Sequence, residues 1–152
     1  MKPSVRTPLP GPKAWALLER GERVLSPSYV RPYPFVPARG QGAFLEDVDG
    51  NLFLDFMSGI AVNTTGYAHP KVVEAVRAQA ERFAHVCCSD VTHEPTLALA
   101  ERLVGKLGGG YRVFFGNSGT EGVEAAIKLV RYHTRRPYLL AFTGAFHGRS
   151  LG

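Results

Sequence analysis

The chain has 152 residues and a net charge of +5, and 45% of its residues are hydrophobic. That length and composition suit one folded domain and exclude an intrinsically disordered chain. No run of about 18 apolar residues occurs, the first residues lack the apolar stretch of a signal peptide, and the basic residues are scattered. We therefore expect a cytoplasmic protein that binds neither membranes nor nucleic acids.

Prolines shape the first 37 residues. Four of them fall within residues 1–13, which predicts an extended arm that needs a partner surface for order, and a short helix is expected over residues 14–20. Between residues 26 and 37, prolines recur with Tyr29, Tyr33 and Phe35 among them. A regular helix is excluded there, and the segment is expected to lie extended across another surface.

A β-hairpin is predicted next. Residues 43–48 and 52–56 are short β-prone runs on either side of Asp49-Gly50-Asn51. An Asp-Gly turn between two such runs is the strongest hairpin signal in the chain. Two antiparallel strands are expected.

Two helices should follow, opened by Pro70 and Pro95, because proline is favoured in the first helical turn. Apolar residues recur at helical spacing on one face of each helix, which predicts that this face is buried. These residues are Val72, Val73, Val76, Ala80 and Phe83 in the first helix and Leu99, Leu103 and Leu107 in the second. Between the helices, Cys87 and Cys88 are adjacent, a spacing that suits neither a metal site nor a disulfide framework. Buried free thiols and no metal site are expected.

The last forty residues predict a strand, a helix and a second strand. Residues 112–115 and 138–142 are the strands, and residues 121–132 form the helix, which buries Val123, Ile127 and Val130. Such alternation implies a parallel sheet, in which ligands bind beyond the carboxyl ends of the strands. The loops after the two strands are therefore expected to meet at one site.

The first of these loops allows two interpretations. Small residues at Ser118, Gly119 and Thr120 lead into a helix, whose first backbone N–H groups can hold a phosphate. Ser118 and Glu121 also fit the S-x-x-E capping box, which needs no ligand. These residues alone leave both interpretations open.

The second loop carries three chemically different side chains. Phe146 can stack on a planar ring, His147 can fix the loop by hydrogen bonding, and Arg149 can clamp a carboxylate. Each also has an ordinary structural explanation, as a core phenylalanine, a hydrogen-bonded histidine and a solvated arginine.

An ordered series of motifs runs through residues 26–152. They are Gly40-x-Gly42, Asp47-Val48-Asp49-Gly50-Asn51, Leu54-Asp55-Phe56, Ser58-Gly59-Ile60-Ala61-Val62-Asn63, Gly66-Tyr67-Ala68-His69-Pro70, Asn117-Ser118-Gly119-Thr120-Glu121-x-x-Glu124 and Phe146-His147-Gly148-Arg149. In this series the chain resembles the class III pyridoxal-phosphate aminotransferases, most of all the 4-aminobutyrate aminotransferases, with Tyr67 in place of the first histidine of the usual G-H-x-H-P. Ornithine and acetylornithine aminotransferases share the main motifs, and some relatives are amino-acid racemases.

The resemblance implies an α/β fold, the N-terminal part of the fold type I pyridoxal-phosphate transferase fold. Residues 1–57 would be the arm and the β-hairpin segment of the small domain. Residues 58–152 would begin the large domain, with its mainly parallel sheet.

The resemblance also implies a cofactor site for pyridoxal 5′-phosphate. Gly119 and Thr120 would bind its phosphate, and Ser118 would shape the loop. Phe146 would stack on the pyridine ring, and His147 would belong to the same site.

The implied reaction is a ping-pong transfer of an amino group from an amino acid to a 2-oxo acid. Arg149 would bind the substrate carboxylate, Ile60 would line the substrate pocket, and Glu124 would lie just behind the cofactor. The intact protein is expected to be a homo-oligomer.

The lysine that forms the Schiff base in this family has no counterpart here. The five lysines lie in the arm, near helix ends or on a helix face, at Lys2, Lys13, Lys71, Lys106 and Lys128. We therefore expect the chain to correspond to the N-terminal portion of an aminotransferase and to be inactive alone. The alternative is a noncatalytic module that associates with a longer partner.

Overall fold

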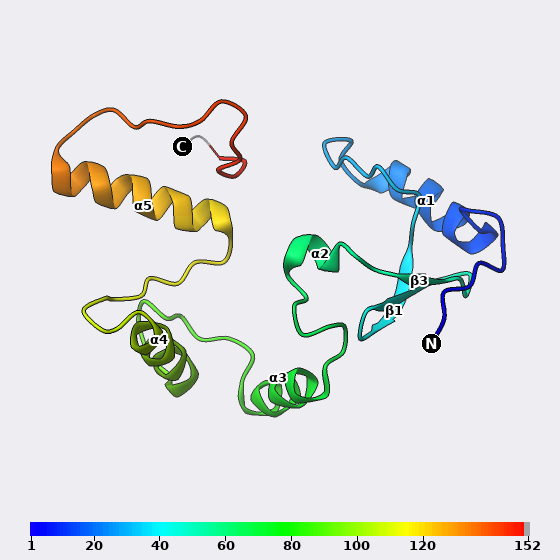
Figure 1. Ribbon diagram of the computed structural model, residues 1–152, viewed down its shortest axis with the longest axis horizontal. Helices are drawn as coiled ribbons and strands as arrows, with labels where there is room; N and C mark the ends of the chain where they lie inside the picture. The colour runs from blue at the N-terminus through cyan, green and yellow to red at the C-terminus, as the bar shows by residue number, and fades with distance from the viewer. Residues whose placement is uncertain (151–152) are drawn as a thin grey trace. The chain divides into compact units, whose positions relative to one another are not determined.

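The computed structural model describes residues 1–150, which divide into two compact units, each considered by itself. The first unit, Met1–His85, holds α1 (Pro12–Val24), β1 (Pro37–Gln41), β2 (Phe44–Asp47), β3 (Leu52–Leu54), α2 (Ser58–Ala61) and α3 (Pro70–Arg82) (Figure 1). The second unit begins at Val86 and holds α4 (Glu94–Lys106) and α5 (Gly119–Thr134). None of these helices is both long and apolar enough to span a membrane.

The sheet of the first unit is antiparallel, in the order β1-β2-β3. The predicted hairpin is confirmed as β2 and β3, which pair from Phe44 with Leu54 to Glu46 with Leu52. Strand β1 was not predicted, because its sequence PARGQ has no β-branched or aromatic residue. Its first residue is Pro37, a position that a strand tolerates because proline cannot donate to the ladder.

The N-terminal arm is ordered by its own chain. Ser4 and Leu52 exchange backbone hydrogen bonds of 2.9 and 2.8 Å, which attaches the arm to β3. The backbone N–H groups of Arg6 and Thr7 both donate to Oδ1 of Asn51. The surface that the arm was predicted to need is provided by the same chain, at β3 and the hairpin turn.

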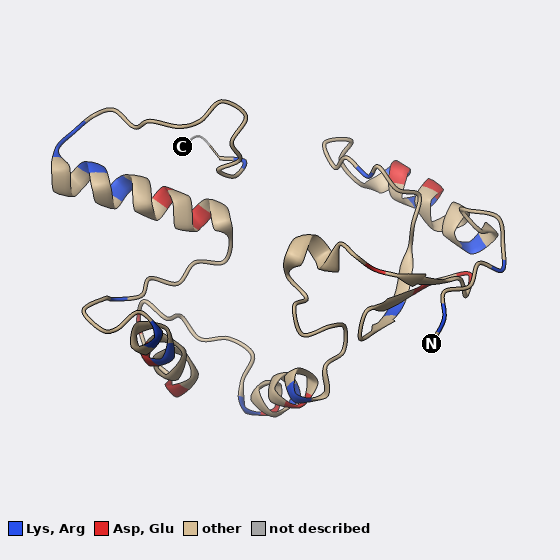
Figure 2. Cartoon of the chain, in the orientation of Figure 1, with Lys and Arg blue, Asp and Glu red and all other residues tan. Residues whose placement is uncertain are grey.

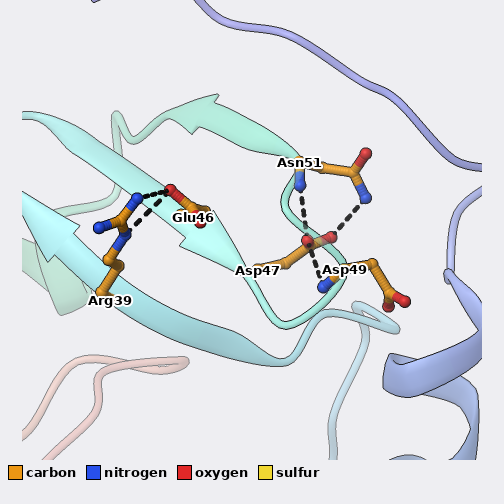
Figure 3. Close-up of polar contacts among 5 residues, drawn as sticks. All are labelled: Arg39, Glu46, Asp47, Asp49 and Asn51. Atoms are coloured by element: carbon orange, nitrogen blue, oxygen red, sulfur yellow. Dashed lines mark hydrogen bonds and ion pairs between the residues drawn. The ribbon is translucent and has the colours of Figure 1, made fainter.

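The hairpin turn is the most buried part of the unit. Asn51 is fully buried and Asp47 is 3% exposed. Oδ1 of Asp47 accepts hydrogen bonds from the backbone N–H groups of Asp49 and Asn51, and Oδ2 accepts from Nδ2 of Asn51 at 2.7 Å (Figure 3). Because the turn and the N-terminal arm together satisfy these polar atoms, two polar side chains are buried without loss of hydrogen bonding.

Asp49 also caps helix α1 from a distant part of the chain. Its carboxylate accepts hydrogen bonds of 2.9 and 2.8 Å from the backbone N–H groups of Lys13 and Ala14, in the first turn of the helix. Gly11, the residue before the helix, has no side chain that could do this. Helix α1 is longer than predicted at both ends, beginning at Pro12 and ending at Val24.

The starts of helices α3, α4 and α5 agree with the sequence, but their apolar faces are only partly covered. Val72, Val73 and Val76 are 48%, 42% and 65% exposed, although these positions were predicted to be buried. Leu99, Leu103, Leu107 and Val130 are also exposed, whereas Val123 and Ile127 are half-buried. The free thiols of Cys87 and Cys88, which were predicted to be buried, are exposed as well. The faces stay open because no other described helix or strand packs extensively on them.

The predicted strands at residues 112–115 and 138–142 do not form within the described residues. Both segments run without helix or strand structure, and no backbone hydrogen bond joins them there. A strand forms only where its backbone N–H and C=O groups can hydrogen-bond to a neighbouring strand. Among the described residues of the second unit, neither segment has such a neighbour. Phe114, Leu140 and Phe142 are accordingly exposed.

Candidate cofactor site

Helix α5 begins with the predicted cap. Ser118 is the N-cap residue, and its Oγ accepts a hydrogen bond from the backbone N–H of Glu121 at 3.2 Å. The Glu121 carboxylate reaches back to the backbone N–H of Asn117, one residue earlier than in the usual capping box. The side-chain pair therefore shapes the loop and fixes where the helix starts.

The cap leaves two backbone donors free. Within residues 1–150, the N–H groups of Gly119 and Thr120 donate to no acceptor. Both lie in the first turn of α5, where the helix dipole favours an anion. Figure 2 shows acidic residues in the first half of this helix and basic residues in its second half, which is the distribution that the dipole favours.

The second loop comes back to the start of α5. The backbone N–H of Arg149 donates to Oγ1 of Thr120 at 3.3 Å. A β-carbon at position 148 would overlap the same oxygen, so only glycine permits this approach. Farther along the helix, Oγ of Ser150 donates to Oε1 of Glu124 at 2.8 Å. The structure thus brings together the two loops that the sequence predicted to meet, although the sheet expected to align them is absent from the described residues.

The side chains proposed for ring and substrate binding are exposed. Phe146 is 79% exposed, and His147 and Arg149 also lie at the surface. Within the described residues, the Arg149 guanidinium forms no ion pair and His147 forms no hydrogen bond. These groups are therefore accessible to a ligand beside the first turn of α5.

Ile60 lies in the first unit, on an unusual backbone turn that the sequence did not predict. The four residues of α2 have φ angles of 50°, 63°, 62° and 61°, so the turn is left-handed. For residues other than glycine this conformation costs about 1–2 kcal/mol each. Ile60 is 83% exposed at its centre.

The turn is preceded by a carboxylate that binds a tyrosine. The Tyr67 hydroxyl donates to Oδ2 of Asp55 at 2.6 Å, and the backbone N–H groups of Met57 and Ser58 donate to the same carboxylate. Hydrogen bonding to Tyr67 and then to Met57 lowers the pKa of Asp55. The bond to Asp55 raises the pKa of Tyr67. Asp55 is thus a charged acceptor and Tyr67 a neutral donor at neutral pH.

The comparisons with known proteins decide the family. The model of the aminotransferase class III family matches residues 25–152. The chain belongs to this family.

Three curated relatives match nearly all of the chain. It is 46% identical to an alanine/serine racemase from Pyrococcus horikoshii, over 99% of this chain and 32% of that protein. It is also 46% identical to an acetylornithine aminotransferase from Mycolicibacterium smegmatis, over 90% of this chain and 34% of that protein. It is 41% identical to a 4-aminobutyrate aminotransferase from Mycobacterium bovis, over 95% of this chain and 32% of that protein. The chain therefore spans about a third of the length of these relatives.

Solved transaminase structures show the same fold. An omega-transaminase from Sphaerobacter thermophilus superposes with a TM-score of 0.83 and 38% identity, over 93% of this chain and 33% of that one. A transaminase with bound PLP superposes with a TM-score of 0.82 and 32% identity, over 91% and 33%. The predicted fold class, part of the fold type I transferase fold, is confirmed.

Proposed function

We propose that this chain supplies the phosphate seat and one wall of the active site of a pyridoxal-phosphate-dependent aminotransferase. The phosphate seat is the phosphate-binding site formed by Gly119 and Thr120 in the first turn of α5. The observation that carries the proposal is the contact of Arg149 and Gly148 with Thr120 beside the two free amides of α5. Family membership and the solved transaminase with bound PLP support the choice of ligand.

The donors present fit a phosphate monoester. The amide N–H groups of Gly119 and Thr120 and the Thr120 hydroxyl lie together in the first turn of a 16-residue helix. The Ser118–Glu121 cap holds these donors in place without using them. Phe146 is the side chain for stacking on the pyridine ring, and His147 stands beside it in the same loop.

When bound, pyridoxal phosphate supplies the carbonyl that accepts an amino group and a ring that takes up the negative charge. The residues of this chain bind and orient the cofactor and the substrate. Arg149 offers a guanidinium for the substrate carboxylate, Ile60 contributes an apolar pocket wall, and Glu124 steadies the second loop through Ser150.

The lysine that completes the reaction is proposed to come from outside residues 1–152. All five lysines here are exposed, four of them on helices and Lys2 in the arm. We further propose that the amino donor is 4-aminobutyrate or a similar ω-amino acid, that the acceptor is a 2-oxo acid, and that the protein works as a cytoplasmic homo-oligomer.

Calorimetric titration of the protein with pyridoxal 5′-phosphate and, separately, with pyridoxal tests the phosphate seat. Hydrogen bonds to a charged group contribute about 1.5–3 kcal/mol each, so pyridoxal should bind at least about tenfold more weakly. Thr120→Val should weaken binding of the phosphate ester more than binding of pyridoxal, because the hydroxyl contacts only the phosphate directly. Thr134→Val, at the other end of α5, is the matched control. Equal affinity for the two ligands would contradict the proposal.

A second candidate is an amino-acid racemase, favoured by the match to the alanine/serine racemase over 99% of the chain. The two activities differ in their need for an acceptor. A racemase converts L-alanine to D-alanine with the cofactor alone, whereas an aminotransferase needs a 2-oxo acid. Chiral chromatography of such incubations distinguishes the two.

A further inference from the structure

The left-handed turn Ser58–Ala61 must be held by its surroundings. Three of its four residues carry side chains, and each of these has a φ between 50° and 62°. L-residues avoid this region, and it persists only where neighbouring structure determines it. The turn's own hydrogen bonds run from Ala61 N–H to Met57 and from Val62 N–H to Ser58, both at 2.9 Å. They do not explain why the chain enters the turn in this way.

Asp55 fixes the entry to the turn. It follows β3, and its backbone N–H donates to the carbonyl oxygen of Ala43 at 2.9 Å, which ties it to the hairpin. One carboxylate oxygen accepts from Met57 N–H at 2.7 Å, and the other from Ser58 N–H at 3.0 Å. The carboxylate thereby holds the two residues that lead into the left-handed conformation.

Tyr67 fixes the carboxylate in turn. Its hydroxyl donates to Oδ2 of Asp55, while its backbone exchanges hydrogen bonds of 2.8 and 3.0 Å with Gly42. Its ring lies so close to β1 that a β-carbon at Gly40 would stand 2.6 Å from Cγ of Tyr67. The ring position is therefore set by the hairpin, and the hydroxyl transmits that position to Asp55.

We propose that Asp55 and Tyr67 are positioning residues that hold the left-handed turn and so set where Ile60 meets the amino-acid substrate. We call the hydrogen bonds of the Asp55 carboxylate with Tyr67, Met57 and Ser58 the clamp. The role of Ile60 rests on the proposed function, whereas the clamp rests on these contacts.

Hydrogen–deuterium exchange of the whole protein tests the clamp. In Tyr67→Phe the ring stays over Gly40 and only the hydroxyl is lost, so amides of residues 57–62 should exchange about tenfold faster. Tyr33→Phe, which removes an exposed hydroxyl from the same unit, is the matched control. Unchanged exchange in Tyr67→Phe would overturn the clamp.

Kinetics with 4-aminobutyrate and 2-oxoglutarate test whether the clamp affects substrate binding. They are measured on a protein that carries this chain together with the lysine proposed to lie outside residues 1–152. In Tyr67→Phe the KM for the amino donor should rise several-fold while the affinity for pyridoxal phosphate, measured by calorimetry, stays unchanged. A rise in exchange with no change in KM would overturn the substrate role. If a protein that carries this chain together with the lysine proposed to lie outside residues 1–152 showed no transamination, the proposed function and that role would be refuted together, and the exchange result would still decide whether the clamp exists.

Discussion

The hydroxyl oxygen of Thr120 accepts a hydrogen bond from the backbone N–H of Arg149 across 29 residues of sequence. This bond joins the N-terminus of α5 to the Phe-His-Gly-Arg loop, and it needs no side chain of that loop. The loop residues can therefore direct their side chains to a ligand while the backbone holds the loop in place. Gly148 and Thr120 fix where the loop lies, and the side chains of Phe146, His147 and Arg149 supply its chemistry.

Gly148→Ala should separate the two loops. The added β-carbon overlaps the Thr120 hydroxyl, and overpacking of this kind costs about 1–3 kcal/mol. We expect affinity for pyridoxal phosphate to fall about tenfold or more in calorimetric titration. Gly144→Ala is the matched control, because Gly144 also has a positive φ, of 79°, but no atom lies within 4 Å of its added β-carbon. Equal losses in the two variants would show that backbone strain, not the overlap, is responsible.

The cap and the phosphate seat should respond to different substitutions. Ser118→Ala removes the acceptor for the Glu121 N–H and should lower the free energy of unfolding by about 1 kcal/mol. Thr120→Val leaves the cap intact and should lower affinity for pyridoxal phosphate with little change in stability. Urea unfolding followed by circular dichroism measures the first effect, and calorimetry the second. If Thr120→Val destabilised the fold as much as Ser118→Ala, the two roles would not be separable.

Asn51→Ala should be among the most destabilising substitutions in the first unit. It leaves the buried Asp47 carboxylate and the N–H groups of Arg6 and Thr7 short of partners, at a cost of about 3 kcal/mol. Arg39→Ala, which breaks the exposed ion pair with Glu46, should cost less than about 1 kcal/mol. Urea unfolding of both variants checks the contrast (Figure 3). Similar losses would contradict the central role of the buried turn.

The Asp55–Tyr67 bond gives a defined pH dependence. The pKa of Asp55 is lowered, so its stabilisation is present above the unfolded value of about 3.9 and is lost as pH falls through the folded value. The pKa of Tyr67 is raised, so its stabilisation is present below about 10 and is lost as pH rises through the folded value.

The unfolding free energies of wild type and Tyr67→Phe, measured over a pH series, reveal this dependence. Their difference should be constant between about pH 5 and 9 and should shrink on either side. Since the substitution removes the bond, any other titrating group affects both proteins alike. A difference that changes near neutral pH would contradict the assignment.

Much of the local structure was predictable because its signals act over a few residues. The Asp49-Gly50 turn, the prolines that open α3 and α4, and the Ser118 cap each specify a conformation through their own backbone or a neighbour's. The ordered motifs likewise indicated the family. No such signal marked β1 or the left-handed turn, since Ser58, Ile60 and Ala61 all disfavour a positive φ.

The sequence by itself determined the hairpin, the starts of α3, α4 and α5, and the family to which the chain belongs. Only the tertiary structure decided that Asp49 caps α1, that Tyr67 binds Asp55, and that Gly148 admits the Thr120 hydroxyl. These contacts join residues that are distant in sequence, so each depends on the path of the chain between them. The pattern of neighbouring residues indicates the conformation that a segment favours locally. Which distant residue it contacts is decided by the fold.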